Sequence, residues 1–93
     1  MNAYPDWLSL RDLDTRAGLP KGAAFRVFKQ LGPQLREGLD FVLLDHQHAQ
    51  QTIAALKIQG RAYQSTVNLV LLHPDAARHI LSVLATHGSA PGN

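Results

Sequence analysis

Two short helical patterns separated by a Gly-Leu-Pro turn constrain the fold of this chain more than any other feature of its sequence. Apolar residues of the first pattern recur at helical spacing: Leu10, Leu13 and Ala17. Ser9 can cap the start of this helix, and Asp12 three residues later completes a capping box. Gly18 suits the left-handed turn that ends many helices. We therefore expect a first helix of about nine residues that begins near Leu10 and stops at Gly18.

A second helix is predicted to follow almost at once, from about Pro20 to Leu31. Pro20 suits the first position of a helix because it lacks an N–H that would be unpaired there. Four apolar residues share one face of this helix: Ala24, Val27, Phe28 and Leu31. The Gly32-Pro33 pair ends it. Arg26 and Lys29 lie off the apolar face, so we expect both to point outward.

The second half of the chain contains two predicted strands and a closing helix. Phe41–Leu44 is a short apolar run between two aspartates and Thr66–Leu72 alternates, so the two should form an antiparallel pair. The roughly 20 residues between them exceed a tight hairpin, and they support two structures that the sequence does not separate. One is a short helix over about Gln47–Leu56, followed by a loop; the other is an extended wing around Gly60. A final helix of about 13 residues with an apolar stripe is predicted to start at Pro74 and to be ended by Gly88.

Length and composition indicate one small globular domain. A chain of 93 residues can build only a modest core, and we assign residues 1–88 to one domain and expect residues 89–93 to fray. The absence of cysteine excludes disulfides and thiolate metal sites. The N-terminus lacks the pattern of a signal peptide, and no apolar run approaches the roughly 20 residues of a membrane span. We therefore expect a soluble, cytoplasmic protein with no membrane partner.

Positive charge is concentrated in one segment of the chain. The net charge of +2 is too small to identify a partner by itself. Between Thr15 and Arg36, however, there are five basic residues and no acidic one, and this segment includes the predicted second helix. The five are Arg16, Lys21, Arg26, Lys29 and Arg36. Solvated side chains on an ordinary helix surface would also account for such a run.

The segment Leu10–Leu31 is similar to the helix-turn-helix of bacterial and phage transcription regulators. Five positions at fixed distances from the turn glycine carry the resemblance: Leu13, Ala17, Leu19, Ala24 and Val27. Two helices that cross at about 100° leave room only for small residues at the crossing. Asp14 departs from this pattern, so we expect its carboxylate to point outward or the crossing angle to differ. Pro20-Lys21-Gly22 also departs from it, which moves base reading away from the first turn of the second helix.

The order of the remaining elements extends the resemblance to winged helix regulators of the excisionase-like type. REGLDF leads into the first predicted strand and LVLLHPDAARHIL leaves the second. The resemblance implies a small α+β winged helix-turn-helix with an N-terminal helical pair, an antiparallel β-hairpin and a C-terminal helix. It also implies sequence-specific binding of double-stranded DNA, as by a transcriptional regulator or repressor of bacterial, phage or mobile-element origin. The reading helix would be residues 20–31.

The resemblance implies that this reading helix docks in the major groove. Arg26 is the first candidate for reading a base, because a guanidinium can donate to both O6 and N7 of guanine, and Lys29 should contact a base or phosphate near the groove edge. Phosphate contacts are expected from three further basic residues: Arg16, Lys21 and Arg36. Solubility alone would also explain the two arginines. A wing would add two more contacts, Lys57 and Arg61, although a solvated loop would also account for them. Phe25 is off the apolar stripe by one residue, and we expect it to join the core rather than touch a thymine methyl.

A protein-interaction module is the alternative function. An antitoxin-like or assembly adaptor domain would keep the helix-turn-helix scaffold without reading DNA. The apolar arc of the final helix is broader than a small core requires, so we expect a homodimer through this helix under either function.

His46 and His48 have only Asp45 as a nearby carboxylate, so we expect no metal site. No catalytic motif is present, and we predict neither enzyme activity nor a cofactor.

Overall fold

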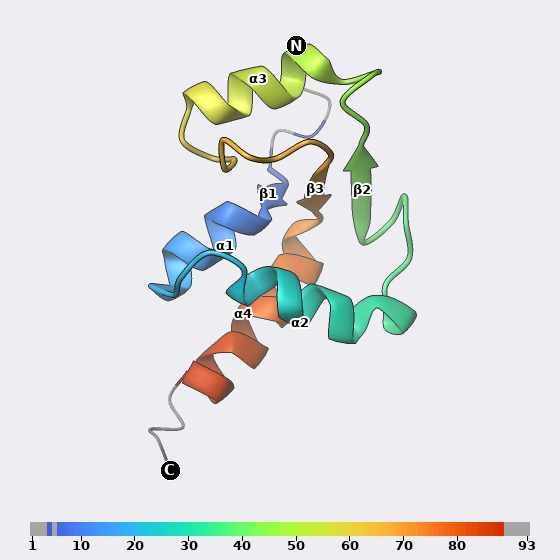
Figure 1. The fold of residues 1–93 in the computed structure, drawn as a ribbon. Coiled ribbons are helices and arrows are strands. Elements are labelled where there is room, and N and C mark those ends of the chain that lie inside the picture. The colour runs from blue at the N-terminus through green and yellow to red at the C-terminus, as the bar shows by residue number, and fades with distance from the viewer. Residues whose placement is uncertain (1–3, 5, 89–93) are drawn as a thin grey trace.

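The structure is a computed structural model that describes Tyr4 and residues 6–88 (Figure 1). Within these residues it is a small α+β fold with four α-helices and a three-stranded antiparallel sheet. The elements in chain order are β1 (Leu8–Ser9), α1 (Leu10–Ala17), α2 (Ala23–Leu31), a 3-10 turn (Gly32–Gln34), β2 (Phe41–Leu44), α3 (Gln50–Ile58), β3 (Leu69–Leu72) and α4 (Pro74–Gly88).

Local signals at both ends of α1 determine where it begins and ends. The Ser9 hydroxyl accepts a hydrogen bond from the Asp12 N–H at 3.0 Å, and the Asp12 carboxylate accepts one from the Ser9 N–H at 2.9 Å. This is the predicted capping box, which pairs two N–H groups that a helix start would otherwise leave free. Gly18 has a φ of 68° and ends the helix, as predicted.

The second helix begins later than the sequence predicts. Pro20 is not its first residue, because Pro20, Lys21 and Gly22 form a turn and α2 begins at Ala23. Gly22 sits at the N-cap with a φ of 97°, a conformation that a residue with a Cβ rarely adopts. The predicted apolar face of α2 is confirmed, with Ala24 and Val27 buried and Phe28 and Leu31 packed beside them.

Three strands, rather than the predicted hairpin of two, make the sheet. The strand order is β1-β3-β2, and both neighbours run antiparallel to β3. The predicted pairing of Phe41–Leu44 with the later strand is confirmed, although that strand covers Leu69–Leu72 and does not begin at Thr66. Leu8 and Ser9 add the edge strand β1, which the sequence analysis missed because two residues are too few to show an alternation.

The sheet separates two clusters of buried side chains. Leu69 and Leu71 of β3 point to one face and pack with Ile53 and Leu56 of α3, as the minor cluster. Leu72 points to the other face and belongs to the main cluster, which is formed with the helices: Leu13, Ala24, Val27, Ala76, Ala77, Ile80 and Leu84. In Figure 1, α3 accordingly lies at one end of the molecule, away from α1, α2 and α4.

The segment between β2 and β3 contains a helix and does not form an extended wing. Of the two structures left open by the sequence, α3 over Gln50–Ile58 matches the short helix, shifted by about two to three residues from the range predicted, as helix boundaries commonly are. Residues 59–68 return to β3 through turns and bends, and Ala62 is buried in the minor cluster.

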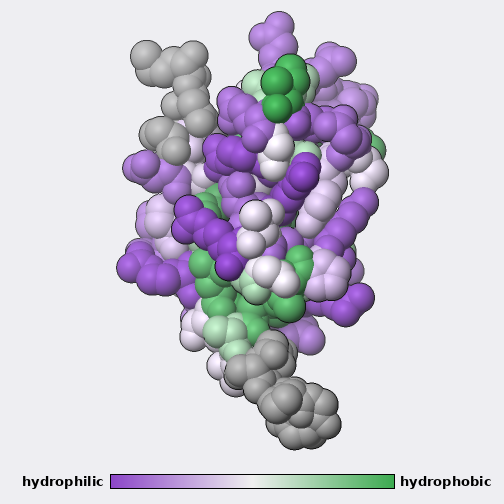
Figure 2. Space-filling view, turned by 90° about the vertical axis from the view of Figure 1, so that its left-hand side faces the viewer, coloured by the Kyte–Doolittle hydropathy of each residue, from purple (hydrophilic) through white to green (hydrophobic). Residues whose placement is uncertain are grey.

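The closing helix α4 runs from Pro74 to Gly88, as predicted. Its buried stripe covers α1 and α2, while Leu81 and Val83 are half-buried and Ala85 is exposed. Figure 2 shows hydrophobic side chains gathered on the surface near the C-terminal end of this helix. None of the helices in the described part of the chain is long and apolar enough to cross a membrane. The predicted fraying of residues 89–93 concerns a segment outside the described residues.

Candidate nucleic-acid interface

The outward face of α2 carries two cationic side chains that stand one turn apart. Arg26 and Lys29 are both exposed, as predicted, and neither forms an ion pair with any residue that the structure describes. The Lys29 ammonium lies 5.6 Å from the centre of the Phe25 ring. These side chains are free to engage an external anion or a hydrogen-bond acceptor.

Phe25 belongs to this exposed face, and the expectation that it joins the core is wrong. Its side chain is 47% exposed. Ala24 and Phe28 occupy core positions of the same helix. Because each helical residue is rotated by about 100° from the one before it, Phe25, directly after Ala24, is turned away from the core. Phe28 instead packs edge-on against Phe41, with ring centres 5.0 Å apart.

Asp14 anchors the start of α2 from inside the protein. Its side chain is only 2% exposed, so the expectation of an outward carboxylate is wrong. One carboxylate oxygen accepts a hydrogen bond from the Ala24 N–H at 2.7 Å, and the other accepts from the Gly22 N–H at 3.2 Å and from the Tyr63 hydroxyl at 2.6 Å. A carboxylate at the positive end of a helix is electrostatically favourable. Asp14 thus acts as a helix cap supplied by the preceding helix.

Tyr63 connects this anchor to the segment that precedes β3. Burial raises the pKa of its hydroxyl to about 12, and the hydrogen bond to Asp14 adds to the effect. The hydroxyl therefore remains a neutral donor at physiological pH. The ring also contacts two cations, with the Arg11 guanidinium carbon and the Lys21 ammonium each 5.1 Å from its centre. Such contacts help to hold the cations in place.

Three of the predicted phosphate contacts lie at the ends of the helix pair, and all three are exposed. Arg16 is in the last turn of α1, and Arg36 follows the 3-10 turn after α2. Neither is ion-paired within the described part of the chain. Lys21 lies in the turn before α2, where its ammonium donates a hydrogen bond to the Ser65 hydroxyl at 2.8 Å.

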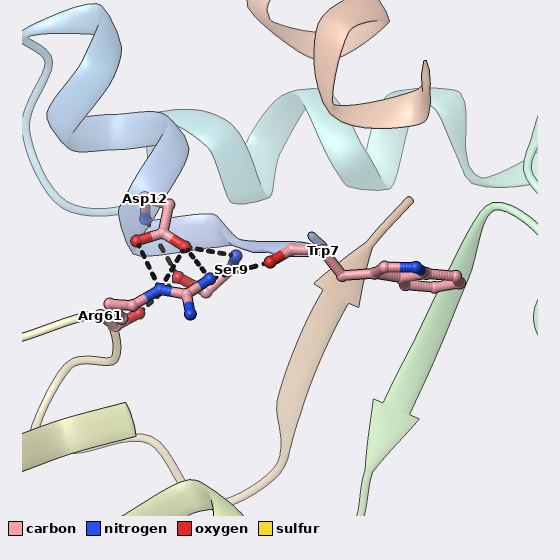
Figure 3. A network of polar contacts seen from close by, with 4 residues as sticks. All are labelled: Trp7, Ser9, Asp12 and Arg61. Atoms are coloured by element: carbon pink, nitrogen blue, oxygen red, sulfur yellow. Dashed lines mark hydrogen bonds and ion pairs between the residues drawn. The ribbon is translucent and has the colours of Figure 1, made fainter. Parts of the chain in front are cut away.

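Arg61 is turned inward and is not a free cation (Figure 3). Its guanidinium donates to the Asp12 carboxylate at 2.8 and 3.0 Å and to the Trp7 carbonyl at 2.8 Å. The Ser9 hydroxyl donates in turn to the Arg61 carbonyl oxygen. The structure therefore does not place Arg61 on an outward wing. Lys57 is half-buried on α3, across the sheet from α2, so the two residues are not part of one surface with Arg26.

A pocket of about 250 Å³ lies between the start of α2 and the segment before β3. Phe25, Lys21, Tyr63 and Thr66 line its rim and walls, and Asp14 is the one acidic side chain among the lining residues that the structure describes. Sequence reasoning did not identify Tyr63 or Ser65. The available signal was Asp14 itself, because an acidic residue between two core positions must find hydrogen-bond partners if it is buried.

Two histidines lie close to the Asp45 carboxylate. His48 Nδ1 lies 3.1 Å from the Asp45 carboxylate, and His46 Nδ1 lies 3.8 Å from it. The backbone N–H of Gln47, followed by the His48 side chain, holds the pKa of Asp45 below its ordinary value. Across the described residues, no group of three or more potential ligands is arranged to hold a metal ion.

Comparison of the chain with known protein families, with curated proteins and with solved structures finds no match. The case for a function therefore depends on the geometry of the chain's own residues.

Proposed function

We propose that this protein binds double-stranded DNA in a sequence-specific manner and reads the major groove with the outward face of α2. One observation carries the proposal: Arg26 and Lys29 project without acidic partners in the described chain from a helix whose start is fixed by Asp14. A fixed helix with free donors loses little conformational freedom on binding. The major groove, about 12 Å wide, admits such a helix.

Arg26 is the residue that we propose reads a base. A guanidinium offers two parallel N–H donors that match O6 and N7 of guanine. Lys29 is one turn further along the same face and is suited to a base or phosphate at the groove edge. Phe25 adds an exposed apolar edge next to Lys29, which suits contact with a thymine methyl.

Phosphate contacts complete the proposed interface at the ends of the helix pair. Arg16, Lys21 and Arg36 are exposed there and carry positive charge without reading sequence. The proposed interface does not include Arg61, which is bound to Asp12, or Lys57, which is on α3 across the sheet from α2.

The finer fold that we propose is a helix-turn-helix with a modified wing. In support, α1 and α2 are joined by residues 18–22 and α4 packs on both, while the strand pair follows in the expected order. The departure is α3, which occupies the connection between β2 and β3 where a winged helix domain has a hairpin tip. We propose action as a transcriptional regulator, a binding function without catalysis.

We also propose that the protein forms a homodimer through the C-terminal part of α4. A groove of about 690 Å³ runs between this part of α4 and the end of α1, and its lining is mostly apolar: Arg16, Ala17, Gly18, Leu19, Leu81, Leu84 and Ala85. Two copies would allow two half-sites to be read one helical turn apart. Light scattering after size exclusion tests this, because Leu81→Glu should convert a dimer to a monomer. A monomeric wild-type protein would contradict it.

Titration of a random-sequence duplex at several salt concentrations tests DNA binding itself. Three phosphate contacts per protomer predict a log-log slope of about −3 between about 50 and 200 mM salt. No binding at low salt, or a slope near zero, would contradict the proposal. Binding of an acidic protein partner without DNA affinity would favour the interaction module instead.

Arg26→Ala tests sequence reading. On a duplex selected from a random library, we expect a loss of about 1 to 3 kcal/mol and weaker discrimination at one base pair. Arg78→Ala is the matched control, because Arg78 is exposed on α4 and is paired with Asp75. Equal losses for the two variants would contradict a reading role for Arg26.

A further inference from the structure

The segment Arg61–Ser65 is held against the N-terminal elements by side-chain contacts at almost every residue. Arg61 binds Asp12 and the Trp7 carbonyl, and the Ala62 carbonyl accepts from Arg11 at 3.1 Å. The Tyr63 hydroxyl reaches Asp14, and Ser65 accepts from Lys21. We call these five residues the clamped segment. Unlike a mobile wing, it is fixed relative to the start of α2.

This arrangement presents Ser65 and Lys21 together on the surface. Both residues are exposed. The Lys21 ammonium uses one of its three donors on the Ser65 oxygen, which leaves two donors for other acceptors. The Ser65 hydroxyl accepts this bond, so its own hydrogen is available for donation to another acceptor. The pair therefore offers a cation and a hydroxyl donor to a single anionic oxygen or to two oxygens of one phosphate.

The first three backbone donors at the start of α2 are already occupied, which gives side chains a larger part in holding an anion there. A helix start ordinarily offers free N–H groups to an anion. Here the N–H groups of Gly22 and Ala24 are bound to the Asp14 carboxylate, and that of Ala23 is bound to the Pro20 carbonyl. These three N–H groups are therefore not available to an anion at this end of α2, which side chains can hold instead.

The pair is also continuous with the proposed reading face. Phe25 lines the same pocket as Lys21 and Tyr63, and on its other side Phe25 contacts Lys29. The Asp14 charge beneath this surface is buried and satisfied by three hydrogen bonds. Phe25 thus links the Lys21–Ser65 pair to Lys29 on the outward face of α2.

We propose that Lys21 and Ser65 bind one backbone phosphate of the DNA duplex read by α2, so that the clamped segment serves as the second contact element in place of a wing. This inference rests on the proposed DNA-binding function. It assigns a role to Ser65, which carries no charge and contributes nothing to the basic pattern of the sequence.

The test measures binding of a random-sequence duplex, by fluorescence anisotropy, to wild-type protein and to Lys21 and Ser65 variants. Lys21→Gln should reduce the steepness of the salt dependence by about 0.9 in the log-log slope. Ser65→Ala should weaken binding about fivefold to tenfold with the slope unchanged, since it removes a hydrogen bond and no charge. In the Lys21→Gln background Ser65→Ala should have less effect, because the two side chains share one phosphate.

A negative charge introduced at Ser65 gives a stronger and independent test. Ser65→Asp places a carboxylate beside the phosphate and neutralises Lys21, so binding should weaken more than about tenfold. Ser82→Asp is the matched control, because Ser82 is exposed on α4 and belongs neither to the proposed surface nor to the lining of the groove beside α4. Light scattering checks that this control keeps the oligomeric state of the wild type. Circular dichroism and thermal melting confirm that each variant is folded.

The outcomes separate this inference from the function on which it rests. If wild-type protein binds duplex and Arg26→Ala impairs it, while both Ser65 variants bind like Ser82→Asp, the phosphate contact is overturned and DNA binding stands. If wild-type protein fails to bind duplex at low salt, the proposed function fails and the phosphate contact falls with it. Loss of binding in Ser65→Asp, with Ser82→Asp unchanged, supports the contact.

Discussion

Helices α2 and α3 have the same length, nine residues each, yet they are held in very different ways. The start of α2 is bound by a buried carboxylate, and the helix packs against both α1 and α4. The N-cap of α3 is Ala49, which has no side-chain cap, and the buried residues of that helix are Ile53 and Leu56. Ile58 at its end is 87% exposed.

This difference indicates which helix can present a defined surface to a partner. A helix fixed by packing and capping keeps its outward side chains at constant positions, whereas a helix held by few buried contacts opens locally at lower free energy. Arg26 and Lys29, which are exposed and form no ion pair in the described part of the chain, are on α2. The helix with the fixed start is thus also the one that carries the two exposed cationic donors. Four predictions test whether anchoring by Asp14 is what distinguishes α2 from α3.

The largest effect is expected for Asp14→Ala. The substitution leaves two backbone N–H groups and the Tyr63 hydroxyl without their acceptor, and we expect the free energy of unfolding to fall by about 3 kcal/mol. Urea denaturation measures the loss. Asp45→Ala, before α3, is the comparison, and we expect a much smaller loss because that carboxylate is solvated. Similar losses would show that α2 has no special anchor.

Three glycines provide the next comparison, because a Cβ at each would meet open space. Gly22 before α2 and Gly60 after α3 have φ values of 97° and 77°, so alanine should cost about 1 kcal/mol at each through backbone strain alone. Gly32 after α2 is right-handed, and alanine there should stabilise by about 0.5 kcal/mol. Thermal melting checks the signs. Of the three, only Gly22→Ala should also weaken DNA binding.

Tyr63→Phe should lower the free energy of unfolding by an amount that depends on pH in the alkaline range. The pKa of Tyr63 is raised to about 12 in the folded protein, above the value of about 10 in an unfolded chain. Its contribution is therefore complete below about pH 10 and is lost as the pH rises toward 12. Wild type should be more stable than the variant at pH 8, and the difference should shrink over that window. A difference that is constant with pH would contradict the raised pKa of Tyr63.

The smallest effect concerns the approach to α3. The pKa of Asp45 is lowered mainly by the Gln47 N–H and next by His48, so its contribution is present above the ordinary carboxyl value and is lost as the pH falls below about 4. Carbon-detected NMR titration should give a pKa below that of a model peptide. Added salt should weaken only the histidine part of the shift. An unshifted value would remove the one polar restraint that we assign to this end of α3.

The sequence predicted those features that depend on residues close together in the chain. The capping box joins Ser9 and Asp12, three residues apart, and the turn glycine Gly18 acts on its own backbone. The stripes of α2 and α4 were likewise visible as spacing. Helix pair, strand pair and closing helix could therefore be predicted, and so could the exposure of Arg26 and Lys29.

The features that the sequence did not predict depend on distant partners. Asp14 is buried because Tyr63 meets it from 49 residues away, and Arg61 turns inward because Asp12 is equally far back in the chain. The pattern alone predicts an outward Asp14 or a different crossing angle, and it leaves Arg61 on a wing or in a solvated loop. Similarly, Pro20 matches a helix start, but the positive φ of Gly22 delays α2 to Ala23.

The position of β3 at the centre of the sheet has a consequence for how the chain acquires its structure during synthesis. Leu72 pairs with both Leu8 and Phe41, so neither outer strand has its partner until β3 has left the ribosome. Helices α1 and α2 emerge long before Tyr63 and β3, and closing such long loops is slow. We therefore expect nascent chains that stop before residue 72 to hold the proposed reading helix only transiently, and we expect the excised helix pair not to fold as an independent binding unit.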